Sequence, residues 1–520
     1  MKKFLSRHVD QVLGCLSGFD RIRFRGTFRQ LAHVSGMQSI LDYLHVLLKD
    51  FHTFAEQTTQ RFRAGVEQFA QRSDCPVQYL ESSQIDKEAL VQKSRAEHGA
   101  SRNGVIAILS AVEVCRSYEI HRDRELKKLK LQSALRKCLH YYVYLQDPMF
   151  GLVHVRMQSW LPFNTHLVIN GREWLGRQMD AKRLKYTRAD NCFTWVEDFD
   201  RAQKLANQQL NTNWPKHLNR ILYHVNPALR DILPTVNLEA YWSAEQSEWA
   251  TDVAFRSASD LTALHARFVQ HAMTHFQSPD VMRFLGRKTY RNGKLHPGFQ
   301  GEVVSDVATR QEGVRVKHRV GGNSVKMYNK QGSVLRVETT INDARDLTVL
   351  RPKEGDAQGK LQYRKLRKGV ADLRRRAQLC QSANQRYLDS LAATDTSTPL
   401  KRFTDRLSQP VITERRRFRA LNPLGSDASL LAAINQPEYL IKGFRNVDIR
   451  TALLGTDPAD PLDRRRRSAR ISRLIALLRA HGLVKKIPQT QRYQITAFAQ
   501  QCLPAIMAAR EASLQKLLAA

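Results

Sequence analysis

The sequence feature that most constrains the fold is an alternation of apolar and polar residues between positions 313 and 342. Val314 and Val316 alternate with Arg315 and Lys317, and the same period of two returns in the runs VKMYNK and VLRVETTIN. The segments between these runs, GGNS and QGS, consist of residues that favour tight turns. The pattern therefore predicts two β-hairpins that form a three-stranded antiparallel sheet.

A second β-rich region lies between residues 135 and 170, and a helix is expected after it, from Arg172. Three strands are predicted in this region, at 141–145, 152–160 and 166–169. The other predicted elements are strands at 21–25 and 104–116, a helix at 38–70 and a mainly helical stretch at 200–290. This order predicts a multidomain α+β protein with antiparallel, palm-like sheets.

Changes in composition divide the chain into four expected regions. Residues 390–430 are rich in Thr, Ser, Pro and Asp and are interpreted as part of a linker. The regions are an N-terminal α+β region (1–125), a central α+β region with two antiparallel β clusters (126–350), a basic helix with the linker (351–434) and a C-terminal winged-helix nucleic-acid-binding domain (435–520).

The charge of the chain is its most unusual compositional property. Its 83 Lys and Arg residues exceed its 49 Asp and Glu residues, so the net charge is +34, whereas the hydrophobic fraction of 42% is ordinary for a globular protein. Residues 361–520 alone carry 30 Lys and Arg against 12 Asp and Glu. Because such an excess repels itself in a compact fold, we expect a polyanionic partner, most simply nucleic acid.

The same sequence disfavours several other classes of protein. No apolar run approaches the roughly 18 residues of a membrane span, so no membrane partner is expected, and no apolar segment follows the start MKKFLSRHVDQ, so no secretory signal is expected. The seven cysteines include no C-x-x-C pair, which disfavours a zinc ribbon or a disulfide framework. We therefore expect a cytoplasmic protein with reduced thiols, and a homo-oligomer is compatible with this interpretation.

The C-terminal region predicts two helices followed by a hairpin. Residues 443–450 are expected to form a short helix, 463–484 a longer helix closed by Gly482, and 483–487 with 492–496 a two-stranded hairpin. This is the order of a winged helix-turn-helix. The run RLIALLRAHGLVKKIPQTQRYQIT resembles the recognition helix and wing of bacterial winged-helix transcription regulators.

The resemblance implies that the longer helix enters the major groove of DNA and that the wing contacts neighbouring phosphates. The alternative is a winged helix that binds protein and whose arginines are only solvated. The candidate nucleic-acid-binding residues in this region are Arg464, Arg465, Arg466, Arg467, Arg470, Arg473, Lys485, Lys486 and Arg492.

The predicted hairpins contain a second motif, in which the run KMYNK at 326–330 is followed by LRVE at 335–338. It resembles the K-x-Y-(D/N)-K … R-x-E pattern of rolling-circle replication initiators of plasmids and filamentous phages. The resemblance implies a palm-like sheet that holds a metal ion. It also implies a tyrosine that attacks a DNA phosphate and leaves a covalent 5′-phosphotyrosine.

On this resemblance Tyr328 is the candidate nucleophile, Glu338 a catalytic metal ligand and His318 an assisting group, while Lys326 and Lys330 bind the phosphate. The alternative is that Tyr328 packs over the sheet and Glu338 pairs with a neighbouring cation.

The family's metal signature, two histidines around one hydrophobic residue, is absent, because the histidines of the β-rich region occur singly. Three other tyrosines therefore stay open as nucleophiles, namely Tyr290, Tyr363 and Tyr387.

Asp20 is a further metal-ligand candidate beside Glu338, because an Asp next to a strand can join a carboxylate cluster that holds Mg²⁺. A turn-capping role for Asp20 is the alternative. The distant carboxylates considered as its partners are Asp190, Glu197, Asp198 and Glu302.

Two more stretches are candidates for nucleic-acid contact. The basic stretch 360–376 is interpreted as a phosphate track, with a solvated helix as the alternative, and its candidate residues are Arg374, Arg375 and Arg376. The aromatic residues of 141–163 can stack on bases, but we favour a role in the core.

Three functions follow as hypotheses. The first is a nucleic-acid-binding protein of mobile-element or replication type that nicks or joins DNA strands with Mg²⁺. The second is a non-catalytic winged-helix regulator that binds DNA. The third is an RNA-binding protein that partners a structured RNA, whose single strands or A-form shape its sheets would recognise.

Overall fold

The computed structural model divides the chain into two compact units. Unit 1 comprises residues 1–262, 281–304 and 308–388, and unit 2 comprises 263–280, 305–307 and 389–520. The residues that the structure describes are 1–98, 104–125, 127–287, 299, 301–310, 313–345, 347–353, 355–356, 358–392, 399–413, 416–436, 439, 443–488 and 490–512.

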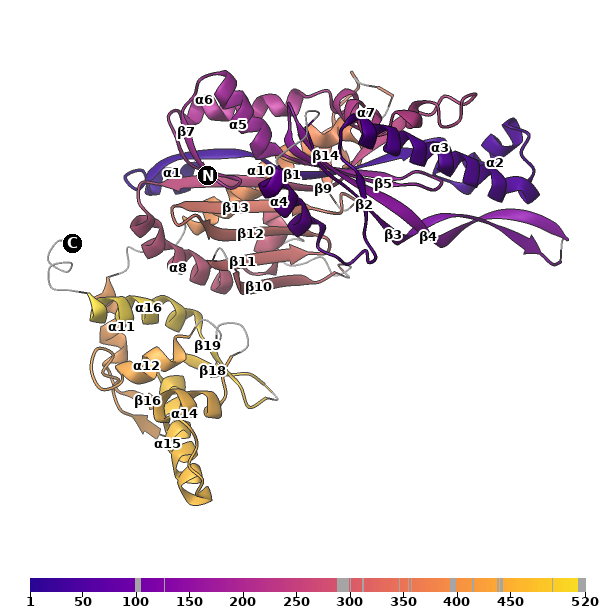
Figure 1. Cartoon of the computed structure of the whole chain (residues 1–520). Helices are drawn as coiled ribbons and strands as arrows, with labels where there is room; N and C mark the ends of the chain where they lie inside the picture. The colour runs from indigo at the N-terminus through magenta and orange to yellow at the C-terminus, as the bar shows by residue number, and fades with distance from the viewer. Residues whose placement is uncertain are drawn as a thin grey trace. The chain divides into compact units, whose positions relative to one another are not determined.

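One large sheet organises the first unit (Figure 1). Its strand order is β10-β11-β12-β13-β9-β1-β6-β5-β4-β3-β2. Successive pairs from β11 to β3 are antiparallel, and β3 pairs with β2 in parallel. The strands are β1 (Val12–Phe28), β2 (Val77–Tyr79), β3 (Val105–Asp123), β4 (Lys128–Asp147), β5 (Gly151–Gln158), β6 (Thr165–Asn170), β9 (Ala240–Phe255), β10 (Val303–Arg310), β11 (Gly313–Val320), β12 (Asn323–Lys330) and β13 (Val334–Ile341).

Helices and short hairpins surround this sheet. The helices of this unit are α1 (Lys2–Arg7), α2 (Val34–Tyr43), α3 (Phe51–Arg72), α4 (Lys87–His98), α5 (Gly171–Ala181), α6 (Phe199–Gln208), α7 (Trp214–Val225) and α10 (Leu373–Leu391). The chain passes between the two units within α8 (Ala258–Thr274) and α9 (Ser278–Phe284), since residues 263–280 belong to unit 2. The hairpins are β7 (Tyr186–Ala189) with β8 (Cys192–Val196), and β14 (Thr348–Arg351) with β15 (Gln362–Lys365).

The two predicted hairpins of 313–342 are confirmed as β11, β12 and β13. The two β clusters are not separate, however, because β9 and β1 join them into a single sheet. The expected boundary between residues 125 and 126 falls in the turn that connects β3 to β4, which pair along their whole lengths. The mixed α and β content agrees with the expected fold class.

Strand β9 lies within the stretch that we expected to be mainly helical, and that expectation is wrong for this segment. Residues 247–255 are buried on both faces of the sheet, so the strand shows no alternation of apolar and polar residues. Without that alternation, the Ala, Glu and Gln content of the segment indicates a helix.

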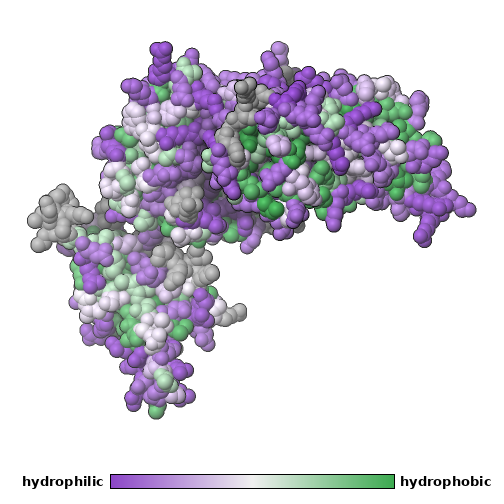
Figure 2. Space-filling model, viewed as in Figure 1, coloured by the Kyte–Doolittle hydropathy of each residue, from purple (hydrophilic) through white to green (hydrophobic). Residues whose placement is uncertain are grey.

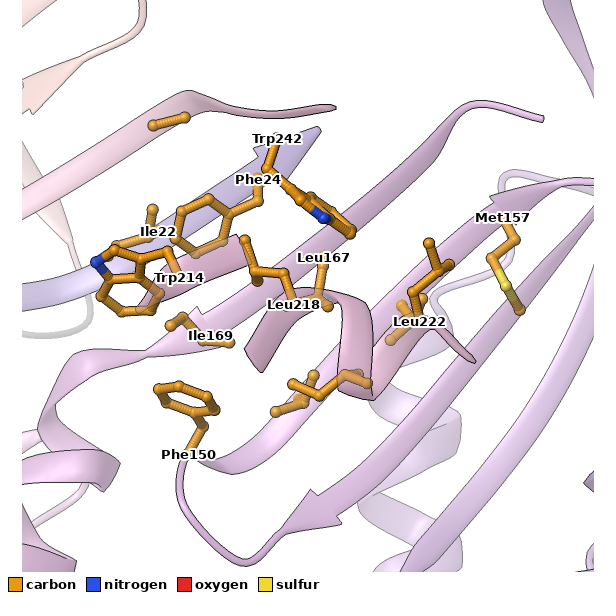
Figure 3. Packing of buried hydrophobic residues seen from close by; sticks show 14 of the residues in the cluster. Ile22, Phe24, Phe150, Met157, Leu167, Ile169, Trp214, Leu218, Leu222 and Trp242 are labelled. Atoms are coloured by element: carbon orange, nitrogen blue, oxygen red, sulfur yellow. The ribbon is translucent and has the colours of Figure 1, made fainter. Parts of the chain in front are cut away.

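Helix α7 covers part of the sheet and packs its buried side chains into the main core (Figure 3). Trp214, Leu218 and Leu222 recur every four residues and are buried. The ring of Trp214 lies 5.2 Å from that of Phe24 on β1 and 5.8 Å from that of Phe150. The aromatic residues Tyr141, Tyr142, Tyr144, Phe150 and Phe163 are also buried, which confirms their expected place in the core.

Unit 2 has a hydrophobic core of its own, to which helix α15 (Pro461–Ala480) contributes Ile471, Ile475 and Leu478. The helix is followed by Gly482 at φ +71°, a conformation that suits glycine, as predicted. The other elements are α11 (Leu400–Leu407), β16 (Val411–Thr413), β17 (Arg416–Phe418), α12 (Ala428–Ile434), α14 (Asn446–Leu454), β18 (Val484–Lys486), β19 (Tyr493–Ile495) and α16 (Ala497–Glu511).

Arg376 anchors α10 to the sheet. Its guanidinium donates hydrogen bonds to Ser247 Oγ at 2.7 Å, to the carbonyl of Ala244 at 2.6 Å and to the carbonyl of Ile341. The side chain is buried, and this burial lowers the pKa of Arg376 to about 10. Arg376 therefore does not lie on a phosphate track, in contrast to our expectation.

We expect Arg376→Met to lower the free energy of unfolding by at least about 3 kcal/mol, because it leaves three buried acceptors without their donors. Urea denaturation measures the change. Arg374→Met is the matched control, since Arg374 is exposed on the same helix and its loss should change stability by less than about 0.5 kcal/mol. Equal losses in the two variants would contradict the anchoring role.

Candidate functional site

Four residues of the predicted motif lie on one face of the sheet. Across β12 and β13, Lys326 is paired with Glu338 and Tyr328 with Arg336. The pairing continues into β9, where Arg336 is opposite Asp252. Directly paired residues project to the same face, so the register gathers these side chains together.

A β-bulge brings Asp20 to the same face. Phe19 of β1 is paired with Trp249, and Arg21 is paired with the adjacent residue Glu248. Asp20 is therefore an extra residue that has no paired residue on β9. A bulge of this kind redirects a side chain and is common beside functional sites.

The result is a cluster of three carboxylates from three strands. One oxygen each from Asp20, Glu248 and Glu338 lies within 4.8 Å of the others, and the three residues are 6%, 8% and 1% exposed. We call Asp20, Glu248 and Glu338 the acidic triad. Among the described residues, it is the one group of His, Cys, Asp and Glu side chains close enough to hold a metal ion.

A buried ion pair lies beside the acidic triad. Arg336 donates from Nε to Asp252 Oδ1 at 2.6 Å and from Nη2 to Oδ2 at 2.9 Å, and Arg172 Nη2 lies 3.1 Å from the same carboxylate. Burial acts to raise the pKa of Asp252, but the two guanidinium groups outweigh it and the pKa lies below the usual value. Asp252 is therefore ionised and already compensated.

Asp20 is less well compensated. Arg336 Nη1 lies 3.5 Å from its Oδ1, and Asn191 Nδ2 donates to the same oxygen at 2.7 Å. Burial, with a further contribution from the Glu338 carboxylate, raises the pKa of Asp20 above its usual value despite Arg336. The acidic triad is thus a place where a proton or a metal cation is favoured.

Tyr328 and Lys326 both contact Glu338. The Tyr328 hydroxyl donates to Glu338 Oε2 at 3.2 Å, and Lys326 Nζ lies 2.8 Å from Oε1. Burial first, and then the Glu338 carboxylate, raises the pKa of the Tyr328 phenol far above its usual value. The phenol is therefore protonated, which suits a hydrogen-bond donor better than a nucleophile.

Lys330 is buried and contacts the turn between β7 and β8. Its Nζ donates to Asp190 Oδ2 at 3.1 Å and to Asn191 Oδ1. Arg336 Nη2 also donates to the Asn191 carbonyl at 2.9 Å. Lys330 thus holds Asn191 next to Asp20, rather than presenting its charge to a phosphate.

The donor set of the acidic triad fits a hard divalent cation. Carboxylate oxygens are the ligands that Mg²⁺, Mn²⁺ and Ca²⁺ prefer. A bound ion would supply charge neutralisation to phosphoryl oxygens. In the metal-free protein, Lys326 beside Glu338 and Arg21, which lies 2.9 Å from Glu248, neutralise part of the negative charge of the triad itself.

His318 lies on the opposite face of the sheet, away from the acidic triad. It is paired with Val325, in the set that alternates with Lys326 and Tyr328. Its Nε2 lies 3.2 Å from the Tyr387 hydroxyl, and burial lowers the pKa of His318 to about 4. The register of β11 against β12 thus separates His318 from Tyr328 and Glu338, which it was expected to assist, and we assign it no catalytic part.

Of the three candidate arginines of the predicted phosphate track, Arg374 is exposed, and Lys360, Lys365 and Lys368 of the same stretch are exposed as well. Arg375 Nη1 donates to Asp372 at 2.9 Å, and Arg376 is the anchor described above. Tyr363 is 73% exposed and Tyr387 is fully buried. Tyr290 lies outside the described residues.

The basic residues of the C-terminal unit divide into two groups. Arg467 donates to the carbonyls of Leu454 at 3.2 Å and Thr456 at 3.4 Å, and Arg492 donates to that of Gly443 at 3.4 Å, so these two stabilise local structure. The remaining predicted residues are exposed: Arg464, Arg465, Arg466, Arg470, Arg473, Lys485 and Lys486.

The sequence analysis did not identify three residues of this site, namely Glu248, Asp252 and Arg172. Glu248 and Asp252 lie on β9, which the sequence indicated as helical, so their positions could not be related to the motif. The separation of four residues between them gave no help, because it places both on one face of either a strand or a helix.

No protein-family model matches the chain, and comparisons with curated proteins and with solved structures find no similar protein. Within the described residues, no helix combines the length and apolar character needed to cross a bilayer.

We expect Asp20→Asn to raise the stability of the metal-free protein at pH 7. The pKa of Asp20 is higher in the folded protein than in the unfolded chain, where it is about 3.9. The contribution of Asp20 to the free energy of unfolding is therefore greatest below the unfolded pKa and is lost as the pH rises through the folded pKa. The amide does not ionise, so the gain should vanish below about pH 4. Urea denaturation in EDTA from pH 3.5 to 7.5 measures it.

The exposed Asp10→Asn is the control for this measurement and should show no such gain. A lower stability of Asp20→Asn than of the unaltered protein at pH 7 would contradict the argument.

Proposed function

We propose that the protein binds duplex DNA through its C-terminal unit. The observation that carries the proposal is a row of exposed arginines, Arg466, Arg470 and Arg473, on one face of α15. They are four and three residues apart, so they project together from the side opposite the buried Ile471 and Ile475. Cations on one helical face suit the major groove, which is wide enough for a helix in DNA but not in A-form RNA.

The surroundings of α15 support a winged helix-turn-helix. Asn446 at the start of α14 donates to the carbonyl of Ser468 at 3.0 Å and to Ser472 Oγ at 2.9 Å, which fixes α14 against α15. Strands β18 and β19 form a hairpin after α15, and Phe444 forms a β-bridge to Tyr493. A third strand-like segment before the helix pair, with the wing after it, suits a domain that inserts its second helix into DNA.

The exposed lysines of the wing complete the proposed surface. Lys485 and Lys486 lie on β18, which begins two residues after Gly482. A wing in this position contacts the phosphates beside the groove that the helix occupies. Phosphate contacts of this type set the position of the protein on the duplex and make the affinity strongly dependent on salt.

We expect replacement of Arg466, Arg470 and Arg473 together by Gln to reduce the salt dependence of duplex binding. Each phosphate contact contributes a slope of about −0.9 to log K against log salt, so three lost contacts should change the slope by up to about 2.7. Fluorescence anisotropy of a 30-base-pair DNA between 50 and 200 mM KCl measures it.

The matched control replaces Lys401, Arg402 and Arg417, which are exposed in the same unit, by Gln. This control removes the same number of positive charges, and its slope of log K against log salt should equal that of the unaltered protein. Equal effects of the two triple replacements would show that binding depends on net charge alone, and preference for duplex RNA would favour the RNA-binding alternative.

The acidic triad favours a second function, Mg²⁺-dependent chemistry at a phosphodiester, as in proteins of mobile-element or replication type. Here Asp20, Glu248 and Glu338 would hold the ion, and Lys326 would face the phosphate. The Tyr328 hydroxyl would orient Glu338 by its hydrogen bond. The convergence of three buried carboxylates supports this function.

We expect Mg²⁺ to raise the urea midpoint of the unaltered protein but not of Glu338→Gln. An ion at 100 times its dissociation constant adds about 2.7 kcal/mol of stability. Cleavage of a labelled single-stranded DNA should be lost in the same variant, and Tyr328→Phe should retain it if the phenol only donates a hydrogen bond. The exposed Glu239→Gln is the control, and full cleavage by Glu338→Gln would exclude this function.

A further inference from the structure

Strands β3 and β4 extend well beyond the sheet as a two-stranded ribbon (Figure 1). The neighbouring strand β2 pairs with β3 only at residues 108–110, and β5 pairs with β4 only from His140 onward. Among the described strand pairings, residues 112–123 of β3 pair only with residues 128–139 of β4. We call this segment, residues 112–139, the β-arm.

The base of the β-arm is fixed to unit 1, whereas its outer half is not. Tyr118 donates from its hydroxyl to the carbonyl of Leu31 at 2.5 Å, and Ser117 Oγ donates to the carbonyl of Leu161 at 2.6 Å. Both side chains are buried. From His121 to Lys130, by contrast, the described residues are exposed apart from the half-buried Asp123.

The β-arm is long enough to lie across a duplex. Residues 112–123 of β3 rise by about 3.3 Å each and span roughly 36 Å, which exceeds the 12 Å width of a major groove about threefold. A two-stranded ribbon is only marginally stable in water on its own. Tyr118 and Leu131 pack into the main core and support the inner part of the arm, so the exposed end at 121–130 is the part that a partner could cover.

The outer half of the β-arm is strongly cationic, and Figure 2 shows hydrophilic side chains at its end. Residues 121–130 contain five Lys and Arg against two Asp and Glu. Lys130 Nζ lies 2.6 Å from Asp123, which compensates one of these cations. The exposed cations of the tip are Arg122, Arg124, Lys127, Lys128 and Lys130.

We propose that the β-arm binds the sugar-phosphate backbone of the same DNA duplex that the C-terminal unit binds. The inference rests on the proposed function and adds a second contact, formed by a different unit of the protein. Charge complementarity selects this partner, because the tip presents cations along both strands. β-Ribbons are an established way for proteins to enter DNA grooves.

A second copy of this chain is the competing occupant of the β-arm. Val114 and Leu135 are 60% and 72% exposed, so the arm also offers apolar surface. A symmetric pair would, however, bring identical surfaces together. Two cationic tips would then repel each other, so DNA suits the arm better.

The test replaces Arg124, Lys127 and Lys128 together by Gln in the full chain and measures binding of a 40-base-pair DNA duplex between 50 and 200 mM KCl. We expect the slope of log K against log salt to fall by up to about 2.7, and hydroxyl-radical protection of the duplex to become shorter. The control replaces the exposed Lys182, Lys185 and Lys216 of unit 1 by Gln and should change neither property.

The outcomes separate this inference from the proposed function. If the tip replacement leaves slope and protection unchanged while the α15 replacement reduces the slope, the β-arm inference fails and DNA binding stands. If the unaltered protein binds no duplex at 50 mM KCl, the proposed function itself fails. If Val114→Ser with Leu135→Ser turns a dimer into a monomer in light scattering without weakening DNA binding, the arm is a contact between copies and the inference is overturned.

Discussion

The buried ion pair between Arg336 and Asp252 is the interaction on which the central sheet most depends. It joins β13 to β9, and both residues are at most 1% exposed. Removing one partner of such a pair costs about 3–5 kcal/mol, because the other charge is left buried without compensation. A shift of one residue between the strands would carry Arg336 to the opposite face. The pair therefore selects the register that places Glu338 close to Glu248.

The acidic triad follows from that register and from one irregularity in β1. Because Asp252 holds two guanidinium groups, Asp20 has only a longer contact with Arg336. The protein thus contains, within a strongly cationic chain, a small buried region where negative charge is incompletely balanced. This imbalance is the physical basis for affinity toward a proton or a divalent cation.

The cationic features proposed to contact DNA are built differently from the acidic triad. Both α15 and the β-arm project exposed Lys and Arg side chains, which need few fixed partners because water and salt screen them. Lys330, Arg376 and Arg467 show the contrast, since their charges are used for hydrogen bonds within the fold. Net charge alone therefore does not identify the residues that meet a polyanion.

Local patterns determined much of this protein from its sequence. The alternation of 313–342 set the hairpins, and helical spacing with Gly482 set α15 and its end. These features depend on contacts between residues close in the chain. Tertiary structure decided that β9 is a strand, that a bulge brings in Asp20 and that Glu248 completes the acidic triad. Pairing between distant strands, and not local preference, controls those positions, because a strand buried on both faces carries no alternation in its sequence.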